Sequence, residues 1–399
     1  MIRGGADSLM QGGGPRPPSG PIRPLDRIDA IDVLRGLALC GVLAINVVTE
    51  FRVSIFQQFL ANGSGMSALD RAVEDFLMLA VDLKAFALFS LLFGIGLAIQ
   101  FERLASNPRR TLLLVRRLIV LLAIGLTHLF LIWNGDILTE YALAGFVALP
   151  FLFGPRWLLA AGSMVFLALY LAMPLLPPIV PFPDAGWITQ HIAEAREVYG
   201  TGRFSEILAF RIREVSAILP LHIFIFPRTV ALFLFGAFAW RTGILRHASA
   251  HKFMLFSVAA LEIAGGVVST LAGDSRVLSD LAPVLLALGY GAAVIALVNL
   301  PSGQRLLTWA APVGRMAFTN YLAQSIIFGW IFYGYGLGLF GRLGVTAALA
   351  IGIVVYAVQV VFSTWWLRRY WYGPVEWLWR TLMYGVPQPM RAIPNRARA

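Results

Sequence analysis

Long apolar runs recur along the whole chain and limit what it can fold into. Each run holds roughly 20 residues, the length that an α-helix needs to cross the hydrocarbon core of a bilayer. The runs occupy residues 27–50, 84–101, 112–133, 136–153, 156–176, 216–240, 252–272, 281–300, 314–333 and 344–367. The regular alternation that a transmembrane β-barrel requires is absent from the sequence. The sequence therefore predicts an all-α, polytopic transmembrane helical bundle of about ten spans.

The overall composition agrees with a membrane protein and argues against other classes. Hydrophobic residues make up 58% of the 399 residues and charged residues only 13%, far from the balance of a soluble domain. The formal net charge of +11 fits the excess of Lys and Arg on the cytoplasmic side of membrane proteins, so no nucleic-acid partner is expected. Cys40 is the single cysteine, and neither an intramolecular disulfide nor a metal site is predicted.

The distribution of basic and polar residues predicts the topology. Residues 1–26 are rich in Gly, Pro and Arg and are expected to form a disordered cytoplasmic tail. Residues 27–380 are expected to form a single transmembrane domain, and residues 381–399 a basic cytoplasmic tail. Most Lys and Arg fall on one side of the predicted spans, which places both termini in the cytoplasm. The polar segment 185–214 predicts surface helices, and the aromatic and basic residues of 365–380 are typical of an interfacial belt.

Polar residues form a stripe along the first apolar helix. Asp29, Asp32, Arg35, Asn46 and Glu50 fall within a sector of roughly 60° on a helix that turns by about 100° per residue. Charged residues inside a bilayer are costly, so the protein must satisfy them internally. Two interpretations remain open: an ion pair between Asp32 and Arg35 that fixes the helix end at the headgroups, or one wall of a functional pocket.

Titratable residues gather at the predicted outer ends of several spans. His128 ends the third span, and Asp136 and Glu140 begin the fourth. Asp136 suits an N-cap and His128 an interhelical hydrogen bond, but a carboxylate beside an imidazole also suits proton transfer. The predicted topology places four further residues at this level: Glu50, Asp82, Lys84 and His222.

Arginines gather at the opposite, cytoplasmic ends. Arg35, Arg117 and Arg315 all fall near these ends. Their planar forks of donors suit a polyanion such as a phosphate-bearing donor, whereas simple anchoring at the membrane surface is the alternative.

Further polar residues lie within the later spans. Arg228 and Glu262 lie deepest and are expected to form a buried ion pair, while Pro220 and Pro227 should break or kink the helix around Arg228. Asn320 and Gln324 are four residues apart, so they share a helix face and are expected to bond each other or a ligand.

Four stretches carry a resemblance to a known family: DAIDVLRGLALCGVLAINV, HLFLIWNGDILTEYALAG, VGRMAFTNYLAQSIIFGWIFYGYGLGLFG and WLRRYWYGPVEWLWR. They resemble, in the expected order, the DUF418 (YeiB-like) family of bacterial membrane proteins over about residues 27–380, with the C-terminal DUF418-like part at about 215–380. The first helix is also similar to that of transmembrane acyltransferases, which include the acyltransferase-3 proteins and heparan-α-glucosaminide N-acetyltransferase.

The match to these acyltransferases is incomplete. Asp32, Arg35 and Gly36 match the signature at the start of the first helix. Asn46 stands near the position where acyltransferase-3 proteins place a histidine, and residues 50–69 contain no histidine that corresponds to that of the lysosomal enzyme.

The resemblance implies a multi-pass protein of the bacterial inner membrane that transfers an acyl group from cytoplasmic acyl-CoA to a small-molecule or glycan acceptor. No permanently bound cofactor is expected. In this scheme Arg35, Arg117 and Arg315 bind the donor. His128, oriented by Asp136 or Glu140, deprotonates the acceptor, and Asn46 stabilises the oxyanion. The remaining polar residues are expected to bind substrate: Glu50, Asp82, Lys84, His222, Arg228, Asn320 and Gln324.

Two other functions fit the same residues. The first is a solute transporter or permease with a central polar pathway, gated by Arg228 and Glu262. The second is a membrane partner without chemistry of its own. An acyltransferase needs one continuous cavity from the arginines to His128, whereas a carrier needs a midplane site between two movable halves.

Overall fold

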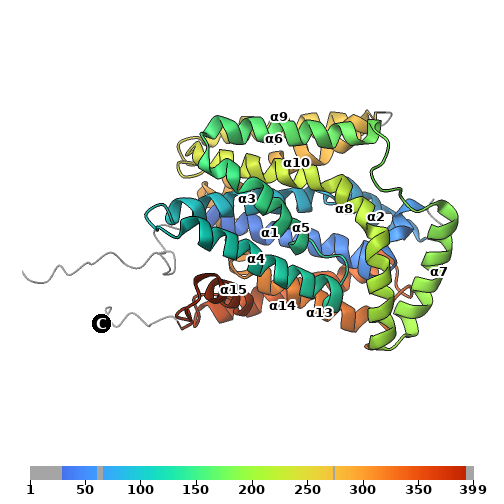
Figure 1. Ribbon diagram of the computed structural model, residues 1–399. Helices are drawn as coiled ribbons and strands as arrows, with labels where there is room; N and C mark the ends of the chain where they lie inside the picture. The colour runs from blue at the N-terminus through green and yellow to red at the C-terminus, as the bar shows by residue number, and fades with distance from the viewer. Residues whose placement is uncertain (1–28, 61–65, 273–274, 392–399) are drawn as a thin grey trace, which may run out of the picture.

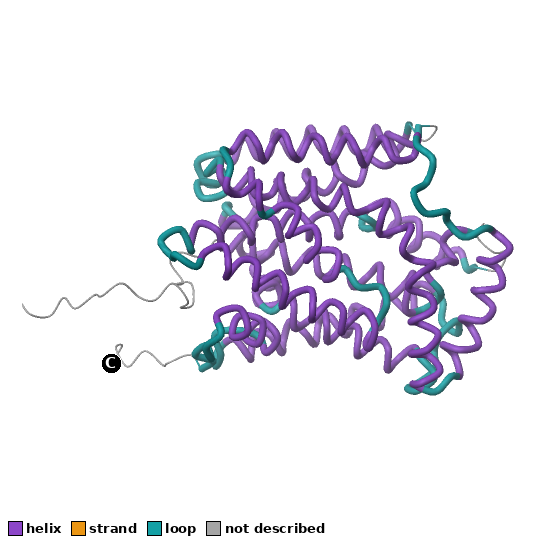
Figure 2. Tube along the Cα trace, viewed as in Figure 1, coloured by secondary structure: helices purple, strands orange, loops and turns teal. Residues whose placement is uncertain are grey.

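Helices and loops make up the computed structural model, which describes residues 29–60, 66–272 and 275–391 (Figure 1, Figure 2). No β-strand occurs within these ranges, which confirms the all-α prediction. The α-helices are α1 (Asp29–Asn46), α2 (Ala68–Ala80), α3 (Lys84–Arg103), α4 (Arg110–Thr127), α5 (Leu138–Ala148), α6 (Arg156–Ala172), α7 (Ala185–Thr201), α8 (Phe204–Arg241), α9 (Lys252–Leu271), α10 (Arg276–Val298), α11 (Pro301–Leu307), α12 (Ala311–Arg315), α13 (Ala317–Phe332), α14 (Val345–Leu367) and α15 (Pro374–Tyr384).

Eight helical segments within the described residues are long and apolar enough to cross a membrane. They are Asp29–Phe51, Ala68–Arg103, Arg110–Ile132, Arg156–Leu175, Phe204–Arg241, Lys252–Leu271, Arg276–Val298 and Val345–Leu367. The other two predicted spans correspond to shorter helices, α5 and α13. The number of crossings, the domain limits and the side of the termini stay predictions. The predicted tail 1–26 and residues 392–399 of the predicted tail 381–399 lie outside the described residues, whereas residues 381–384 belong to the end of α15.

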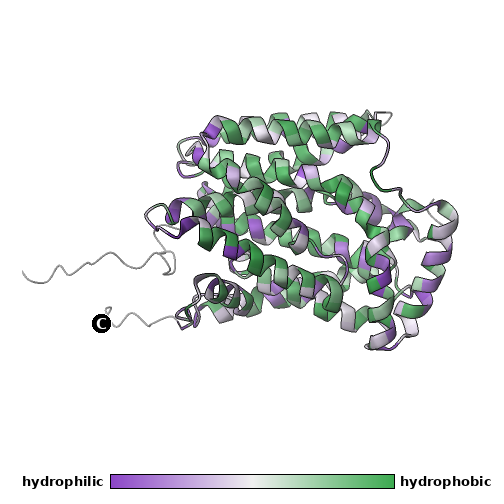
Figure 3. Cartoon of the chain, in the orientation of Figure 1, coloured by the Kyte–Doolittle hydropathy of each residue, from purple (hydrophilic) through white to green (hydrophobic). Residues whose placement is uncertain are grey.

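Helix α1 is the central element of the bundle (Figure 1). In its most apolar stretch 78% of the residues are buried, against 22% in the segments of α6 and α9. Figure 3 shows α6 and α9 as largely hydrophobic helices at one face of the bundle, as lipid-facing helices should be. Because other helices surround α1, its polar stripe faces protein rather than lipid.

Two glycines bring α1 and α12 into direct backbone contact. A Cβ atom on Gly314 would lie 1.8 Å from the carbonyl oxygen of Asp32, and one on Gly36 would lie 2.2 Å from that of Ala310. Only glycine allows so close an approach. Since Arg35 precedes Gly36 and Arg315 follows Gly314, the contact brings two arginines to the same crossing.

Helices α1 and α4 both end in a π-helical turn, a feature often found at functional sites. The turns span Val47–Phe51 and His128–Ile132, closed by bonds from Arg52 N to Val47 O (3.1 Å) and from Trp133 N to His128 O (2.7 Å). The ring of Phe51 stacks on that of Trp133 with centroids 4.4 Å apart. The packing of these turns joins the end of α1 to the turn between α4 and α5.

The polar segment before the sixth predicted span forms one separate helix, α7, and the first part of α8. Helix α8 runs unbroken for 38 residues through Pro220 and Pro227. Of the two predicted outcomes, a break or a kink, the structure shows the second: α8 is unbroken but changes direction along its course, as interior prolines allow (Figure 1).

Candidate active site

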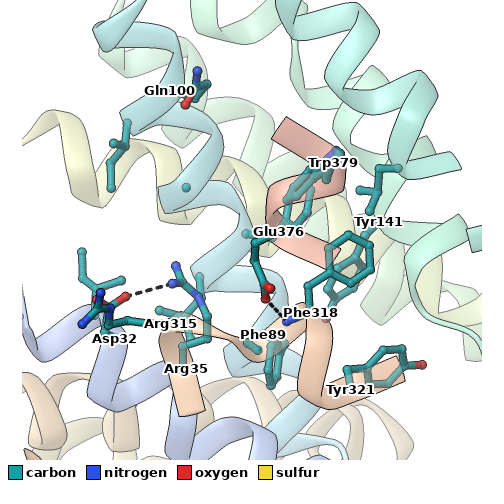
Figure 4. A pocket seen from close by; sticks show the side chains of 18 of the residues that line it. Asp32, Arg35, Phe89, Gln100, Tyr141, Arg315, Phe318, Tyr321, Glu376 and Trp379 are labelled. Atoms are coloured by element: carbon teal, nitrogen blue, oxygen red, sulfur yellow. Dashed lines mark hydrogen bonds and ion pairs between the residues drawn. The ribbon is translucent and has the colours of Figure 1, made fainter. Parts of the chain in front are cut away.

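A cavity of about 330 Å³ opens between α1, α3, α4, α5, α8, α12, α13 and α15 (Figure 4). Its size falls within the usual range of small-molecule sites. Its apolar wall includes Phe89, Leu92 and Phe93. Its charged lining, among the described residues, consists of five arginines and two carboxylates: Arg35, Arg103, Arg117, Arg315, Arg380, Asp32 and Glu376. This excess of guanidinium groups favours an anionic ligand.

The three arginines predicted to converge do line this one cavity. Arg35 Nη1 donates to Asp32 Oδ1 at 3.1 Å, so the predicted ion pair of the first helix exists and also forms part of the wall. Figure 4 shows Arg315 beside this pair at one side of the cavity, with Glu376, Phe318 and Tyr321 at the other. At the arginine end of the polar stripe, the predicted ion pair is therefore confirmed and also lines a cavity, whose function stays a prediction.

Helix α15 contributes cavity residues that the sequence analysis assigned to an interfacial belt. The guanidinium of Arg117 lies 4.1 Å from the ring centroid of Trp379, whose Nε1 donates to Arg117 O at 3.0 Å. Arg117 Nε and Arg380 Nη1 are buried and have no hydrogen-bond partner among the described residues. The belt interpretation is therefore wrong for Trp379 and Arg380, which face the cavity and leave donors for a ligand.

A buried carboxyl fixes α15 against the start of α13. Glu376 Oε1 accepts hydrogen bonds from Phe318 N at 2.8 Å and Thr319 N at 3.1 Å, while Oε2 accepts one from Thr319 Oγ1 at 2.5 Å. Burial raises the pKa of this carboxyl above its ordinary range. Glu376 thus closes one wall of the cavity and caps a helix at the same time.

Tyr321 lines the cavity, and on its other side it contacts His128, which is fully buried. The centroids of the two rings are 5.2 Å apart, and the hydroxyl of Tyr321 donates to Gly135 O at 3.3 Å. One side chain therefore separates the arginine-lined cavity from the predicted base.

His128 lies between an aspartate and a serine. Its Nδ1 is 2.8 Å from Asp136 Oδ1 and its Nε2 is 2.9 Å from Ser325 Oγ, and all three side chains are buried. Asp136 also accepts hydrogen bonds from Leu138 N at 3.1 Å and Thr139 N at 2.7 Å. Asp136 therefore serves both as the predicted cap of α5 and as the group that orients the imidazole.

Glu140, the alternative partner for His128, is engaged elsewhere. Its Oε1 accepts a hydrogen bond from Thr229 Oγ1 at 2.5 Å, and its Oε2 lies 2.9 Å from His222 Nδ1. The structure thus separates the two carboxylates, and Asp136 is the one that contacts His128.

The outer residues predicted to cluster are brought close together. Glu50 lies within electrostatic range of His222 and Asp82, and Lys84 Nζ donates to Met78 O at 2.9 Å. Glu50 also lines a cavity of about 10 Å³, room for roughly one water molecule. Gly135 lines this small cavity and Tyr321 the large one, so the Tyr321–Gly135 contact lies in the wall between them.

Glu214 belongs to this outer group of titratable residues, although it was not among the predicted site residues. It accepts hydrogen bonds from Asn134 Nδ2 at 2.6 Å and Tyr199 Oη at 2.6 Å, and lies 2.7 Å from His191 Nε2. The prediction of surface helices over 185–214 missed this residue, because one face of the first part of α8, with Phe210, Arg211 and Glu214, is buried. A carboxylate leading directly into an apolar run was the available signal.

Several predicted residues stabilise helix packing and do not line the large cavity. Arg228 forms no salt bridge with Glu262; Asp82 and Asp280 lie near it, and the ring of Tyr170 is 5.8 Å away. Asn320 donates to Ser363 Oγ at 3.0 Å and Gln324 to Gln359 Oε1 at 2.8 Å, so both bind α14 and not each other.

Asn46, the predicted oxyanion group, is buried at the end of α1. It forms no hydrogen bond with His128, and its Oδ1 has no partner among the described residues. Within the same residues, no group of three or more His, Cys, Asp or Glu is arranged to hold a metal ion.

Comparison with known proteins gives matches over nearly the full chain. The family model described as "Protein of unknown function (DUF418)" matches residues 231–386, which include α13, α14 and α15. "Uncharacterized protein YxaH" of Bacillus subtilis (strain 168) is 36% identical over 390 residues, covering 92% of this chain and 96% of its own. "Uncharacterized protein YeiB" of Escherichia coli (strain K12) is 28% identical over 386 residues, covering 92% and 98%.

Proposed function

We propose that this chain, which belongs to the DUF418 family, transfers an acyl group across the bacterial inner membrane. The donor is cytoplasmic acyl-CoA, and the acceptor is a small molecule or a glycan on the opposite side. The observation that carries the proposal is the cavity with five arginines that ends one side chain away from the Asp136–His128 pair.

The arginine end suits the donor because acyl-CoA carries several phosphate groups and a long, largely uncharged arm. Arg35, Arg117 and Arg315 come from three different helices and offer planar, charged donors for the phosphates. Burial of the unpaired donors on Arg117 and Arg380 destabilises the empty site. An anion that accepts hydrogen bonds from these donors would remove this cost. The apolar wall around Phe89 and Phe93 suits the arm and the acyl group.

The opposite end suits the acceptor chemistry. Asp136 accepts hydrogen bonds from backbone N–H groups, so its carboxylate is an acceptor that holds the proton of His128 on Nδ1. His128 Nε2 then carries a lone pair and acts as the general base for an acceptor hydroxyl or amine.

Binding of labelled acetyl-CoA to the purified full-length protein tests the donor site. We expect saturable binding that weakens as salt rises, and weaker binding of S-acetyl-N-acetylcysteamine, which is an acyl thioester without phosphates. Arg117→Gln should lower the affinity about tenfold. Arg276→Gln, at the exposed start of α10 and outside the cavity lining, is the matched control.

Turnover separates this proposal from a permease. An acyltransferase releases free CoA, whereas a solute carrier would move a labelled solute into vesicles and leave thioesters intact. Absence of acetyl-CoA binding at millimolar concentration would contradict the proposed function.

A further inference from the structure

Ser325 completes a hydrogen-bonded chain with His128 and Asp136. We propose that Ser325 is the nucleophile of a two-step transfer: its Oγ receives the acyl group from the donor and then passes it to the acceptor. This inference rests on the proposed function and adds a covalent intermediate to it.

The geometry matches what an activated serine requires. Ser325 Oγ is 2.9 Å from His128 Nε2, although 197 residues separate the two in sequence, and His128 Nδ1 is 2.8 Å from Asp136 Oδ1. An aspartate, a histidine and a serine in this order make a serine nucleophilic on several unrelated folds, and the arrangement is recognised by geometry and not by sequence order.

The protonation states follow from the surrounding bonds. Asp136 accepts hydrogen bonds from Leu138 N and Thr139 N in addition to the contact with His128, which is the pattern of an ionised carboxylate. His128 therefore bears its proton on Nδ1, and its Nε2, 2.9 Å from Ser325 Oγ, is placed to accept the hydroxyl proton; a second acceptor near this hydroxyl is Tyr321 O, at the longer distance of 3.4 Å. This is the state from which a serine attacks a carbonyl carbon.

The wall between the two cavities favours a covalent intermediate over direct transfer. Tyr321 lines the arginine-lined cavity, Gly135 lines the small cavity with Glu50, and the Tyr321–Gly135 hydrogen bond joins the two walls. Tyr321 and Ser325 are one turn apart on α13, so Ser325 lies directly behind the end of the donor cavity. A direct transfer would need donor and acceptor to be present at His128 at the same time, whereas a relay lets them reach Ser325 one after the other.

The two steps balance in atoms and protons. In the first, Ser325 Oγ bonds to the thioester carbonyl carbon while its proton passes to His128 Nε2. The carbon–sulfur bond then breaks, and the leaving thiolate takes that proton to give free CoA. In the second, His128 Nε2 takes the proton of an acceptor hydroxyl, whose oxygen attacks the serine ester. The bond to Oγ breaks and Oγ recovers the proton, while the side chain of Tyr321 must swing aside for the donor to reach Ser325.

Trapping of the intermediate tests the inference. The full-length protein is mixed with labelled acetyl-CoA without acceptor, quenched in acid and digested. We expect one acetyl group on the peptide that contains Ser325, released by hydroxylamine only at alkaline pH, as for an oxygen ester. Ser325→Ala should lose the label, and its CoA release should fall by about 10³-fold or more.

Two further variants keep the result interpretable if Ser325→Ala folds poorly. Ser325→Cys should retain the label but release it to neutral hydroxylamine, because the bond is then a thioester. Ser363→Ala, at another buried serine that bonds Asn320, should be labelled like the wild type.

Two results would overturn the relay, and they differ in what they say of the proposed function. If the wild type transfers acetyl groups without label on Ser325, and Ser325→Ala keeps its turnover, the relay is wrong and direct transfer stands. If the protein neither binds acetyl-CoA nor releases CoA, the proposed function fails and the relay fails with it.

Discussion

Asp136 Oδ1 lies 2.8 Å from His128 Nδ1, and the two residues belong to opposite sides of the short turn between α4 and α5. The π-helical turn at the end of α4 places the imidazole, and the cap at the start of α5 places the carboxylate. A local turn therefore fixes the orientation of an imidazole that lies beside a cavity lined by eight helices.

Asp136→Asn should lower CoA release by about 10²- to 10⁴-fold, because an amide can donate to Nδ1 and so favours the wrong imidazole tautomer. Thr139→Val serves as the control, because it removes from the same turn a buried hydroxyl that has no hydrogen-bond partner in the described part of the chain. Steady-state rates measured beside thermal unfolding separate chemistry from folding. Undiminished turnover in Asp136→Asn would show that this carboxylate does not orient a base.

Tyr321→Ala should open the end of the donor cavity toward His128. We expect faster consumption of acetyl-CoA without acceptor, because water then reaches the reacting carbonyl. Tyr321→Phe keeps the ring that covers His128 and loses only the bond to Gly135, so its hydrolysis should stay near that of the wild type. Equal hydrolysis by both variants would argue against Tyr321 as the barrier.

Arg380→Gln should weaken acetyl-CoA binding by about tenfold, the effect of losing one charge-assisted hydrogen bond. The loss should shrink at high salt, where screening already weakens the attraction. Arg369→Gln removes a nearby exposed arginine that lies 4.6 Å from the ring of Trp365 and outside the cavity lining. Isothermal titration at two salt concentrations checks both variants, and an equal loss in Arg369→Gln would refute a specific role for Arg380.

Stability should fall as pH rises, in part because of Glu376. Burial raises the pKa of this carboxyl, so the folded protein holds its proton at pH values where the unfolded chain has released it. The window opens near the ordinary carboxyl pKa of about 4.3 and extends up to the raised value. Within it, folding binds a proton, and each rise in pH favours the unfolded state.

Thermal unfolding across this range tests the effect, with Glu376→Gln as the variant. Glutamine keeps an oxygen for the N–H groups of Phe318 and Thr319 but cannot ionise. Its unfolding temperature should therefore vary less with pH than that of the wild type. An unchanged pH profile would exclude Glu376 as a source of the dependence.

Gly314→Ala should destabilise the fold, because its Cβ would lie 1.8 Å from the backbone oxygen of Asp32. Overpacking of this kind costs about 1–3 kcal/mol, and backbone on both sides gives little room to relax. Gly96→Ala is the matched control, since a Cβ there meets nothing within 4 Å. Thermal unfolding in a constant detergent compares the two, and equal stability would contradict the tight crossing of α1 and α12.

The apolar runs were enough to predict the helices, because their length and hydropathy follow from the bilayer. The convergence of Arg35, Arg117 and Arg315 was also predictable, since each lies at the same end of an apolar run. His128 and Asp136 lie eight residues apart across a turn, so local spacing was sufficient to pair them.

Other features depend on how the helices are rotated against one another, which helical periodicity does not specify. Ser325 is 197 residues from His128 and looks like any serine in an apolar helix. Trp379 and Arg380 follow the pattern of interfacial residues and yet face inward. Arg228 and Glu262 were predicted to lie at the same depth, but predicted depth did not reveal that Asp82 and Asp280 are the neighbours of Arg228.

The crossing of α1 and α12 has a consequence for ligand choice. Arg35 and Arg315 each adjoin a glycine whose backbone touches the other helix, so the separation of their Cα atoms is set by main-chain contact and not by adaptable side chains. The crossing therefore fixes the distance between the two arginines. A molecule whose negative groups do not match this distance cannot bind both arginines fully. Substitutions that adapt the cavity to a new donor would then occur in α15 and the aromatic wall, while the distance between Arg35 and Arg315 stays constant.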